Sequence, residues 1–297
     1  MAKKLNKKVA VIGIVLLALV VIGGAGLAFR YFYHRNPDLN LDLARQALAE
    51  DDYQRAERLL SRAYRFGKTD AYQIERLFEL ADLHLIHNEL HEANWDKALR
   101  CWNTVVNIDP GHLEAHRRIL NYFYEMADSG MIAAWRNVHD RATKLVELIE
   151  QKGDSVDTEL QMRLGRAALA IARRGGTGTA ERTNYLNQAI DIFETLIQRE
   201  PTTPSHYTYL AEAMQLQGEL NAQVGVMNAR ENARREAVRR LDEAVEKADN
   251  TAEALAARYQ FEIQTLGNDP NRVESLRAEL EEHVRTLEPD ANLLTVL

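Results

Sequence analysis

A recurring pattern of small, bulky and apolar residues at helical spacing constrains this chain more than any other feature. Two full copies share offsets of zero, four, seven and twelve residues: Ala98/Trp102/Val105/Pro110 and, 91 residues later, Ala189/Phe193/Leu196/Pro201. Residues that are four and seven positions apart lie on one face of an α-helix. The two copies therefore predict a chain that repeats one helical unit.

Weaker copies of the pattern fill the intervals. They are Ala56/Leu60/Ala63, Ala142/Val146/Ile149 and Ala237/Leu241/Ala244, with a degenerate sixth copy expected between Leu276 and Leu287. The small residue recurs every 42 to 48 residues. A small residue suits the close crossing of two antiparallel helices, and a proline ends a helix so that the chain can reverse. We therefore expect an all-α fold of five to six αα-hairpins, stacked into a solenoid over residues 38–290.

This spacing resembles the second helix of the tetratricopeptide repeat family. Leu164-Gly165 stands where the family has Leu-Gly, and Asp51-Asp52-Tyr53 and Asn94-Trp95 look like its hairpin turns. The resemblance covers about residues 38–290 and implies a right-handed αα-hairpin solenoid that binds protein or peptide partners. The family period is about 34 residues. Because the intervals here are longer, we expect lengthened helices or protruding turns at residues 87–93, 173–182 and 219–234.

The same resemblance implies a partner-binding concave face, formed by outward positions of the first helix of each unit. By alignment these positions are Arg117, Asn121, Tyr124, Arg163, Arg166, Thr208, Glu212 and Gln215. The three arginines would form a basic patch suited to an extended peptide that carries carboxylates. The alternative is that these arginines pair with neighbouring glutamates of the chain itself: Glu114, Glu125 or Glu159.

An uncharged run of 21 residues, from Val9 to Phe29, indicates a transmembrane helix. At a rise of about 1.5 Å per residue it spans a hydrocarbon core of about 30 Å. Four lysines in residues 1–8 predict a cytoplasmic tail, with a juxtamembrane linker at residues 30–37 and the repeats outside the cytoplasm. The alternative is a signal peptide that is cleaved to release a secreted domain. Gly24 and Ala28 are spaced for self-association of two membrane helices.

Charge argues against nucleic acid as a partner. Residues 1–35 hold six Lys/Arg and no Asp/Glu, whereas the remaining residues hold 31 Lys/Arg and 44 Asp/Glu. Such an acidic body repels a phosphate backbone. No catalytic constellation or cofactor motif stands out in the sequence, so we expect neither enzyme activity nor a cofactor.

Histidines supply the only weak indication of a metal site. His84, His87 and His91 stand at i, i+3 and i+7, a spacing that can bring imidazoles to one helix face for zinc. The alternative is that they are solvated histidines beside a turn. We expect no metal.

Together these features predict a membrane-anchored scaffold for protein–protein interaction in an envelope-associated assembly. The alternative is a regulatory or substrate-presenting segment of a larger enzyme, because tetratricopeptide units precede the catalytic region in some glycosyltransferases. Residues 291–297 restart the apolar pattern, which predicts the start of a further, truncated helix.

Overall fold

Helices account for all the regular secondary structure in the described part of the chain, as the sequence predicts. The computed structural model describes residues 31–86, 93–174, 178–265 and 270–286, together with Leu17, Val21 and Gly24. The helices are α2 (Pro37–Ala49), α3 (Tyr53–Phe66), α4 (Asp70–Leu85), α5 (Trp95–Ile108), α6 (Leu113–Asp128), α7 (Ala134–Gln151), α8 (Thr158–Arg174), α9 (Thr179–Arg199), α10 (Pro204–Gln223), α11 (Ala229–Lys247), α12 (Ala252–Thr265) and α13 (Pro270–Thr286).

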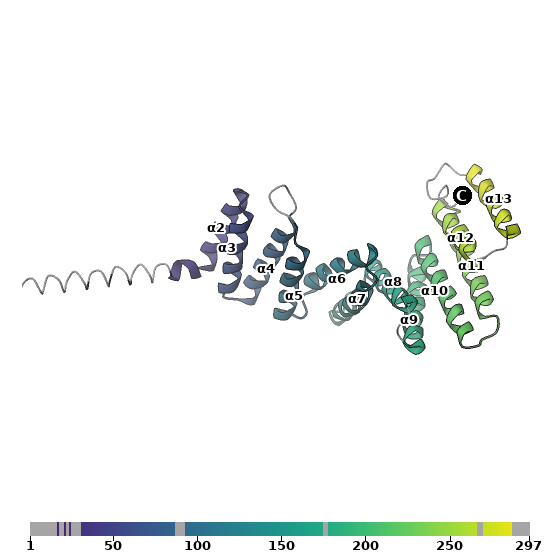
Figure 1. Cartoon of the computed structure of the whole chain (residues 1–297), viewed down its shortest axis with the longest axis horizontal. Coiled ribbons are helices and arrows are strands. Elements are labelled where there is room, and N and C mark those ends of the chain that lie inside the picture. Colours follow the sequence, from purple (N-terminus) through teal and green to yellow (C-terminus); the bar gives the residue numbers. More distant parts are fainter. Residues whose placement is uncertain are drawn as a thin grey trace, which may run out of the picture. The chain divides into compact units, whose positions relative to one another are not determined.

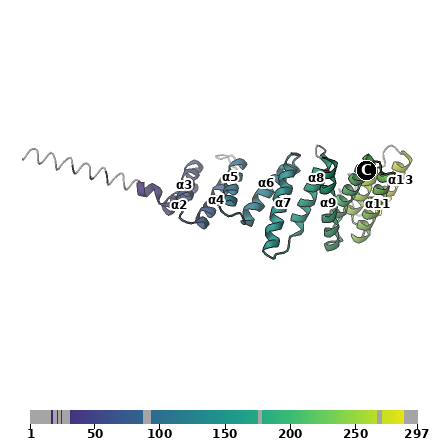
Figure 2. The ribbon, with the colours of Figure 1, turned by 90° about the horizontal axis from the view of Figure 1, so that it is seen from below.

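These helices form six consecutive pairs, from α2/α3 to α12/α13 (Figures 1 and 2). Polar N-caps define several of the turns. Asp52 accepts a hydrogen bond from the Arg55 amide at 3.0 Å, and Asn94 accepts one from the Lys97 amide at 3.0 Å. These caps satisfy amides that have no partner inside the helix. The structure therefore has both turns that the sequence indicates.

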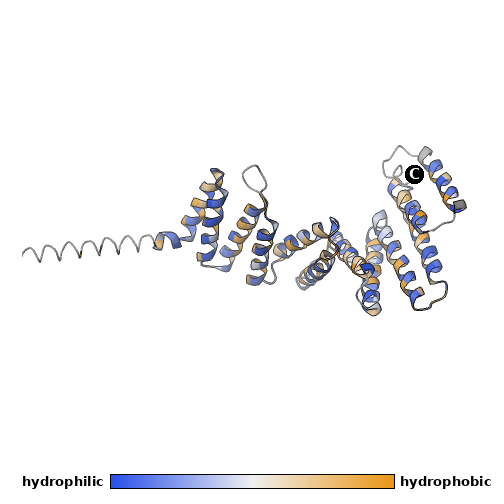
Figure 3. Ribbon diagram, in the orientation of Figure 1, coloured by the Kyte–Doolittle hydropathy of each residue, from blue (hydrophilic) through white to orange (hydrophobic). Residues whose placement is uncertain are grey.

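The small residue of the repeat is buried in five of the second helices. Ala56, Ala98, Ala142, Ala189 and Ala237 are all fully buried in second helices. The bulky residue four positions on is buried in four of these five units. In α7 Val146 is only half-buried, and Leu145, one position earlier, fills the core instead. Figure 3 shows apolar and polar residues alternating along the helices.

Ion pairs between residues about one repeat apart fix the register between neighbouring units. Arg45 pairs with Glu79 at 3.5 Å, between α2 and α4. Arg166 pairs with Asp128 at 2.7 Å, between α6 and α8, and Arg136 of α7 lies 3.2 Å from a carboxylate of α9. Between α6 and α8, Arg163 contacts Asn121 and Arg166 contacts Asp128, so these two first helices run parallel. This arrangement is the stacking expected of a solenoid.

Lengthened helices absorb most of the extra residues of the later units. Helices α9, α10 and α11 have 21, 20 and 19 residues, whereas α3 and α5 have 14 each. The insertion at residues 219–234 lies mainly within α10 and α11. The sequence allows either lengthened helices or protruding turns for the extra residues. In these repeats the helices are lengthened, and each added helical turn can bury more apolar surface.

A hydrogen bond that the sequence analysis did not predict recurs at the start of several units. A side chain in the first helix bonds to the carbonyl oxygen six residues earlier. Asn40, Gln73, His116 and Tyr207 do so at 3.0 to 3.1 Å. The bonds of Gln73, His116 and Tyr207 hold the turn between two repeats against the helix that follows it, whereas the acceptor of Asn40 lies in the helical residues 31–35.

Two compact regions make up the chain, Met1–Ile119 and Leu120–Leu297, with the boundary inside α6. We call these regions the first unit and the second unit, as distinct from the single repeats. No helix within the described residues is both long and apolar enough to cross a membrane. The predicted span Val9–Phe29 lies almost wholly outside those residues, as does the predicted further helix at 291–297, so both stay predictions. In the predicted linker, residues 31–35 are helical.

Candidate functional site

The residues predicted to line a concave face separate into two groups in the second unit. Arg117 is the exception: it is an exposed side chain of α6 in the first unit. Asn121, Tyr124, Arg163 and Arg166 form one group, on α6 and α8. The other group, Thr208, Glu212 and Gln215, lies on α10. The two groups have different chemistry.

The first group is part of an arginine–aromatic cluster, which we define as Tyr124, Trp135, Arg163, Arg166 and Tyr209. The Arg166 guanidinium carbon lies 5.2 Å from the ring centre of Tyr124, 5.6 Å from that of Trp135 and 5.2 Å from that of Tyr209. The Arg163 guanidinium lies 4.6 Å from the Tyr124 ring. Cations over aromatic faces are attracted by the ring quadrupole. The cluster therefore joins α6, α7, α8 and α10.

Both arginines of this cluster also bond to polar groups of the chain. Arg163 pairs with Glu159 and bonds to the Asn121 side chain. Arg166 pairs with Asp128 at 2.7 Å and donates to the Tyr124 hydroxyl. Burial raises the pKa of Tyr124, and its interaction with Arg166 opposes that rise. The Arg163–Glu159 pair matches the alternative prediction, in which the arginines neutralise carboxylates of the chain itself.

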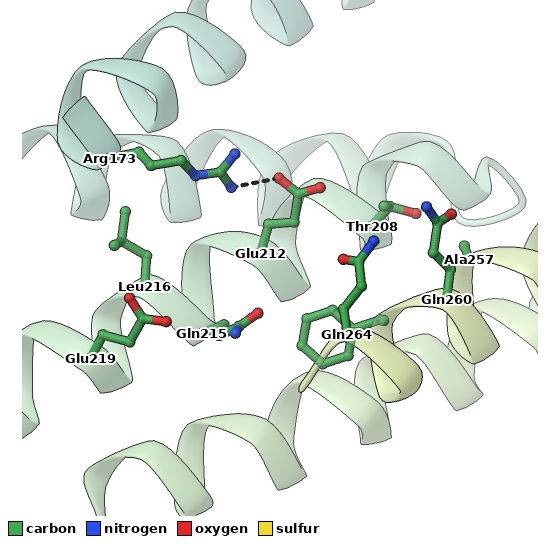
Figure 4. Close-up of a pocket in the computed structure, with 10 residues that line it drawn as sticks. Arg173, Thr208, Glu212, Gln215, Leu216, Glu219, Ala257, Gln260 and Gln264 are labelled. Carbon is green, nitrogen blue, oxygen red and sulfur yellow. Dashed lines mark hydrogen bonds and ion pairs between the residues drawn. The ribbon is translucent and has the colours of Figure 1, made fainter. Parts of the chain in front are cut away.

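The second group lines a pocket between α8, α10 and α12, which we call the α10 pocket. Its volume is about 430 Å³. Its lining consists of Arg173, Thr208, Glu212, Gln215, Leu216, Glu219, Ala257, Gln260, Phe261 and Gln264 (Figure 4). All three residues that the sequence predicts on α10 contribute to this one cavity. Leu216 and Phe261 are buried and give it an apolar floor.

Three of the seven polar side chains that line the α10 pocket are uncharged glutamine amides. No described residue forms a hydrogen bond with the side chain of Gln215, Gln260 or Gln264, so their donors and acceptors are available. Arg173 pairs with Glu212 at 2.8 Å, as Figure 4 shows on one side of the pocket. Glu219 has no ion-pair partner among the described residues. The lining thus carries one uncompensated negative charge.

Several pocket residues were not predicted from the sequence. Arg173 and Glu219 lie in the segments that the sequence analysis treated as insertions, because they exceed the family period. Gln260 and Gln264 lie on α12, the first helix of the most degenerate unit. Their four-residue spacing puts both on one helix face. That spacing was the available signal, but the partner face on α10 could be known only from the fold.

Only one of the three histidines predicted as weak metal candidates lies in the described residues. His84 is buried on α4, and His87 and His91 lie outside the described residues. Within the ranges that the structure describes, no three His, Cys, Asp or Glu side chains are grouped as metal ligands.

Comparison with known proteins gives similarities only among solved structures. No family model and no curated protein matches the chain. A crystal structure of a MamA protein is 17% identical, covers 73% of this chain and 93% of its own, and has a TM-score of 0.42. The C-terminal part of a TPR repeat-containing protein from Cytophaga hutchinsonii is 12% identical, covers 91% of each chain and has a TM-score of 0.48.

A third similar structure is a thermophilic TPR protein from Thermus thermophilus, which is 19% identical over 88% of this chain and 96% of its own, with a TM-score of 0.29. A fold of this kind does not name a ligand. The paired helices of the described residues, with a buried small residue in each of five second helices, have the αα-hairpin fold that the predicted likeness to the tetratricopeptide repeat family implies.

Proposed function

We propose that this chain is a non-catalytic scaffold that binds an extended segment of a partner protein in the α10 pocket. The observation that carries the proposal is the set of three available glutamine amides around a buried apolar floor. An extended peptide presents one N–H and one C=O group at nearly every residue. A glutamine side chain offers both a donor and an acceptor, so it can bond to either group.

The shape and lining of the α10 pocket support a short peptide segment. Binding sites for small ligands are concave and combine an apolar surface with a few polar groups that fix orientation. Leu216 and Phe261 would receive one apolar side chain of the partner. The amides of Gln215, Gln260 and Gln264 would bond to the backbone on either side of it. The size of the cavity, about 430 Å³, suits one or two residues of such a segment.

The charges in the α10 pocket favour a neutral or basic segment over an acidic one. Arg173 is already paired with Glu212, and Glu219 adds a negative charge. Two of the three arginines predicted to attract carboxylates, Arg163 and Arg166, bond to acidic groups of the chain itself. A lysine or arginine of the partner beside Glu219 would complement the pocket, whereas a carboxylate there would be repelled.

Site-specific photo-crosslinking in native membranes tests this proposal. A photoreactive residue at Gln260 should crosslink to one defined segment of a partner, which mass spectrometry would identify. The matched control is the same photoreactive residue at Gln151, an exposed glutamine at the end of α7. The same crosslinks at both positions would contradict a partner site in the pocket.

A synthetic peptide that copies the crosslinked segment then permits an affinity measurement. Each hydrogen bond to an amide contributes about 1 kcal/mol, so Gln260→Ala should weaken peptide binding about fivefold and Gln215→Ala/Gln260→Ala about thirtyfold. Gln151→Ala should leave the affinity unchanged. Titration calorimetry gives all three values, and an unaltered Kd for the double variant would refute the peptide-binding role of these amides.

We also propose that residues 9–29 tether the scaffold to a membrane with the repeats on the extracytoplasmic side. The length of the apolar run and the four lysines before it support this topology. The full chain should remain in membranes after alkaline carbonate extraction, and a variant without residues 9–29 should be released. Protease added to intact spheroplasts should digest the repeats. A mature N-terminus after Ala28 would instead support the secreted alternative.

A further inference from the structure

Two hairpin turns of the second unit expose large apolar side chains. The α6–α7 turn presents Met131 and Ile132, which are 50% and 59% exposed, and the α10–α11 turn presents Val224, Val226 and Met227, which are 65%, 51% and 85% exposed. Within the described residues of this unit, the exposed large apolar side chains all lie in these two turns. Exposed apolar residues gathered in this way indicate an interaction site.

Both turns hold these side chains on the same rigid backbone structure. Gly130 and Gly225 have φ angles of 102° and 88°, in the region that favours glycine. In each turn the glycine N–H bonds to the carbonyl three residues earlier, and the next N–H bonds to the carbonyl five residues earlier, at 3.0 to 3.1 Å. In such helix ends the residue after the glycine usually packs back onto the helix. Here Met131 and Val226 stay exposed instead.

The two turns lie on the same edge of the second unit. Arg163 and Arg166 contact Asn121 and Asp128 of α6 in the same chain order, and Arg166 and Arg173 likewise contact Tyr209 and Glu212 of α10. These first helices are therefore parallel and end on one side. The turns that follow them form one edge, and the turns between units form the opposite edge.

The two edges carry opposite charge. The edge with the apolar turns has Arg173, Arg174 and Arg182 against Glu181 between α8 and α9, Arg230, Arg234 and Arg235 against Glu219 and Glu231 around the α10–α11 turn, and Arg136 against Glu125 and Asp128 around the α6–α7 turn. The opposite edge has Glu150, Asp154 and Asp157 against Lys152, and Glu246, Asp249 and Glu253 against Lys247. Arg174 and Arg230 are exposed, and no described carboxylate pairs with either.

We propose that this edge docks on the surface of an anionic phospholipid bilayer. Met131, Ile132, Val226 and Met227 would enter the headgroup region, and Arg174 and Arg230 would contact lipid phosphates. Apolar side chains flanked by cations bind at such interfaces through buried apolar area together with attraction to anionic lipids. A second copy of this chain fits less well, because its acidic edge offers no large apolar side chain, among the described residues, to cover these turns.

A fluorescent probe on the full chain, reconstituted into vesicles, tests this inference independently of the α10 pocket. A polarity-sensitive maleimide is attached through Met227→Cys, and Asp154→Cys on the opposite edge is the matched control. Cys101 is buried, so it should not compete for the label in the folded chain. Mixed phosphatidylglycerol–phosphatidylcholine vesicles are compared with phosphatidylcholine alone. Acrylamide is the quencher, because its neutrality makes it insensitive to the surface charge.

We expect the probe at position 227 to shift to the blue and to be protected from acrylamide only in the anionic vesicles, while the probe at 154 stays quenchable. One arginine near an anionic surface favours binding by about fivefold. Arg174→Glu/Arg230→Glu should therefore lower the protected fraction by tenfold or more on the same basis, whereas Lys152→Glu should not.

Equal quenching at 227 in both kinds of vesicle would overturn the inference. Protection in detergent without lipid that increases with protein concentration would also overturn it, and would assign the edge to a second copy instead. Because the substituted side chains are exposed, a circular dichroism spectrum equal to that of the unmodified chain verifies that each variant is folded.

Discussion

Gly218→Ala should separate two helices that the structure holds in close contact. Gly218 is a buried residue of α10, one turn after Gln215 of the pocket. A Cβ atom at this position would lie 2.5 Å from the Ala233 Cβ and 3.0 Å from the Ala229 carbonyl oxygen, both on α11. One of these neighbours is backbone, so it cannot rotate away. Helix α11 itself would have to move.

Two opposing terms determine the size of the effect. Replacing glycine by alanine inside a helix stabilises it by about 1 kcal/mol when nothing else changes. Overpacking a closely packed site costs about 1 to 3 kcal/mol, and a contact with backbone belongs at the upper end. We therefore expect a net destabilisation of about 2 kcal/mol for the α10–α11 pair.

Hydrogen exchange of the full chain is the suitable assay, because a stack of repeats can unfold unit by unit and then has no single unfolding free energy. Amides of α10 and α11 should exchange faster in Gly218→Ala, while those of α3, in the other unit, serve as an internal control. Adding Ala233→Gly should restore about 1 kcal/mol in a double-mutant cycle. Slower exchange in Gly218→Ala would refute the steric argument.

Three further predictions concern the rest of the chain. Trp102 is 1% exposed, so Trp102→Ala should destabilise the α4–α5 pair by about 3 to 5 kcal/mol, measured by hydrogen exchange, whereas Trp95→Ala, at 43% exposed, should cost no more than about 0.5 kcal/mol; equal effects would contradict the repeat assignment. Burial raises the pKa of Cys101 to about 11. The thiol should therefore stay protonated at pH 8, with roughly two hundredfold less thiolate than an ordinary cysteine, and react with iodoacetamide only after unfolding; rapid alkylation of the folded chain would disprove this. Glu262 is buried and pairs with Arg258 at 2.6 Å. Glu262→Gln should accelerate exchange in α12 and α13, equivalent to about 1 to 3 kcal/mol, because a largely buried arginine loses one of its carboxylates; unchanged exchange would show that Asp242 and Glu279 suffice to compensate Arg258.

The amino-acid sequence by itself determined the repeated unit of this protein. The spacing of Ala98, Trp102 and Val105 predicts one buried helix face without reference to anything distant in the chain. Caps such as Asp52 and Asn94 are equally local, since each bonds to a backbone amide three residues on. The helices and their pairing could therefore be predicted, because helix periodicity and capping depend on neighbours within a few residues.

Only the tertiary structure decided what the exposed side chains of the first helices do. Arg163 and Arg173 are both exposed-face arginines in the sequence, yet one joins an aromatic cluster and the other pairs with Glu212 at the pocket. Gln260 and Gln215 are 45 positions apart and line the same cavity. The physical reason is that a contact between units depends on the register of whole helices, and this chain departs from the family period. Helix periodicity shows which face a side chain lies on, but only the packing of α8, α10 and α12 shows which side chains meet.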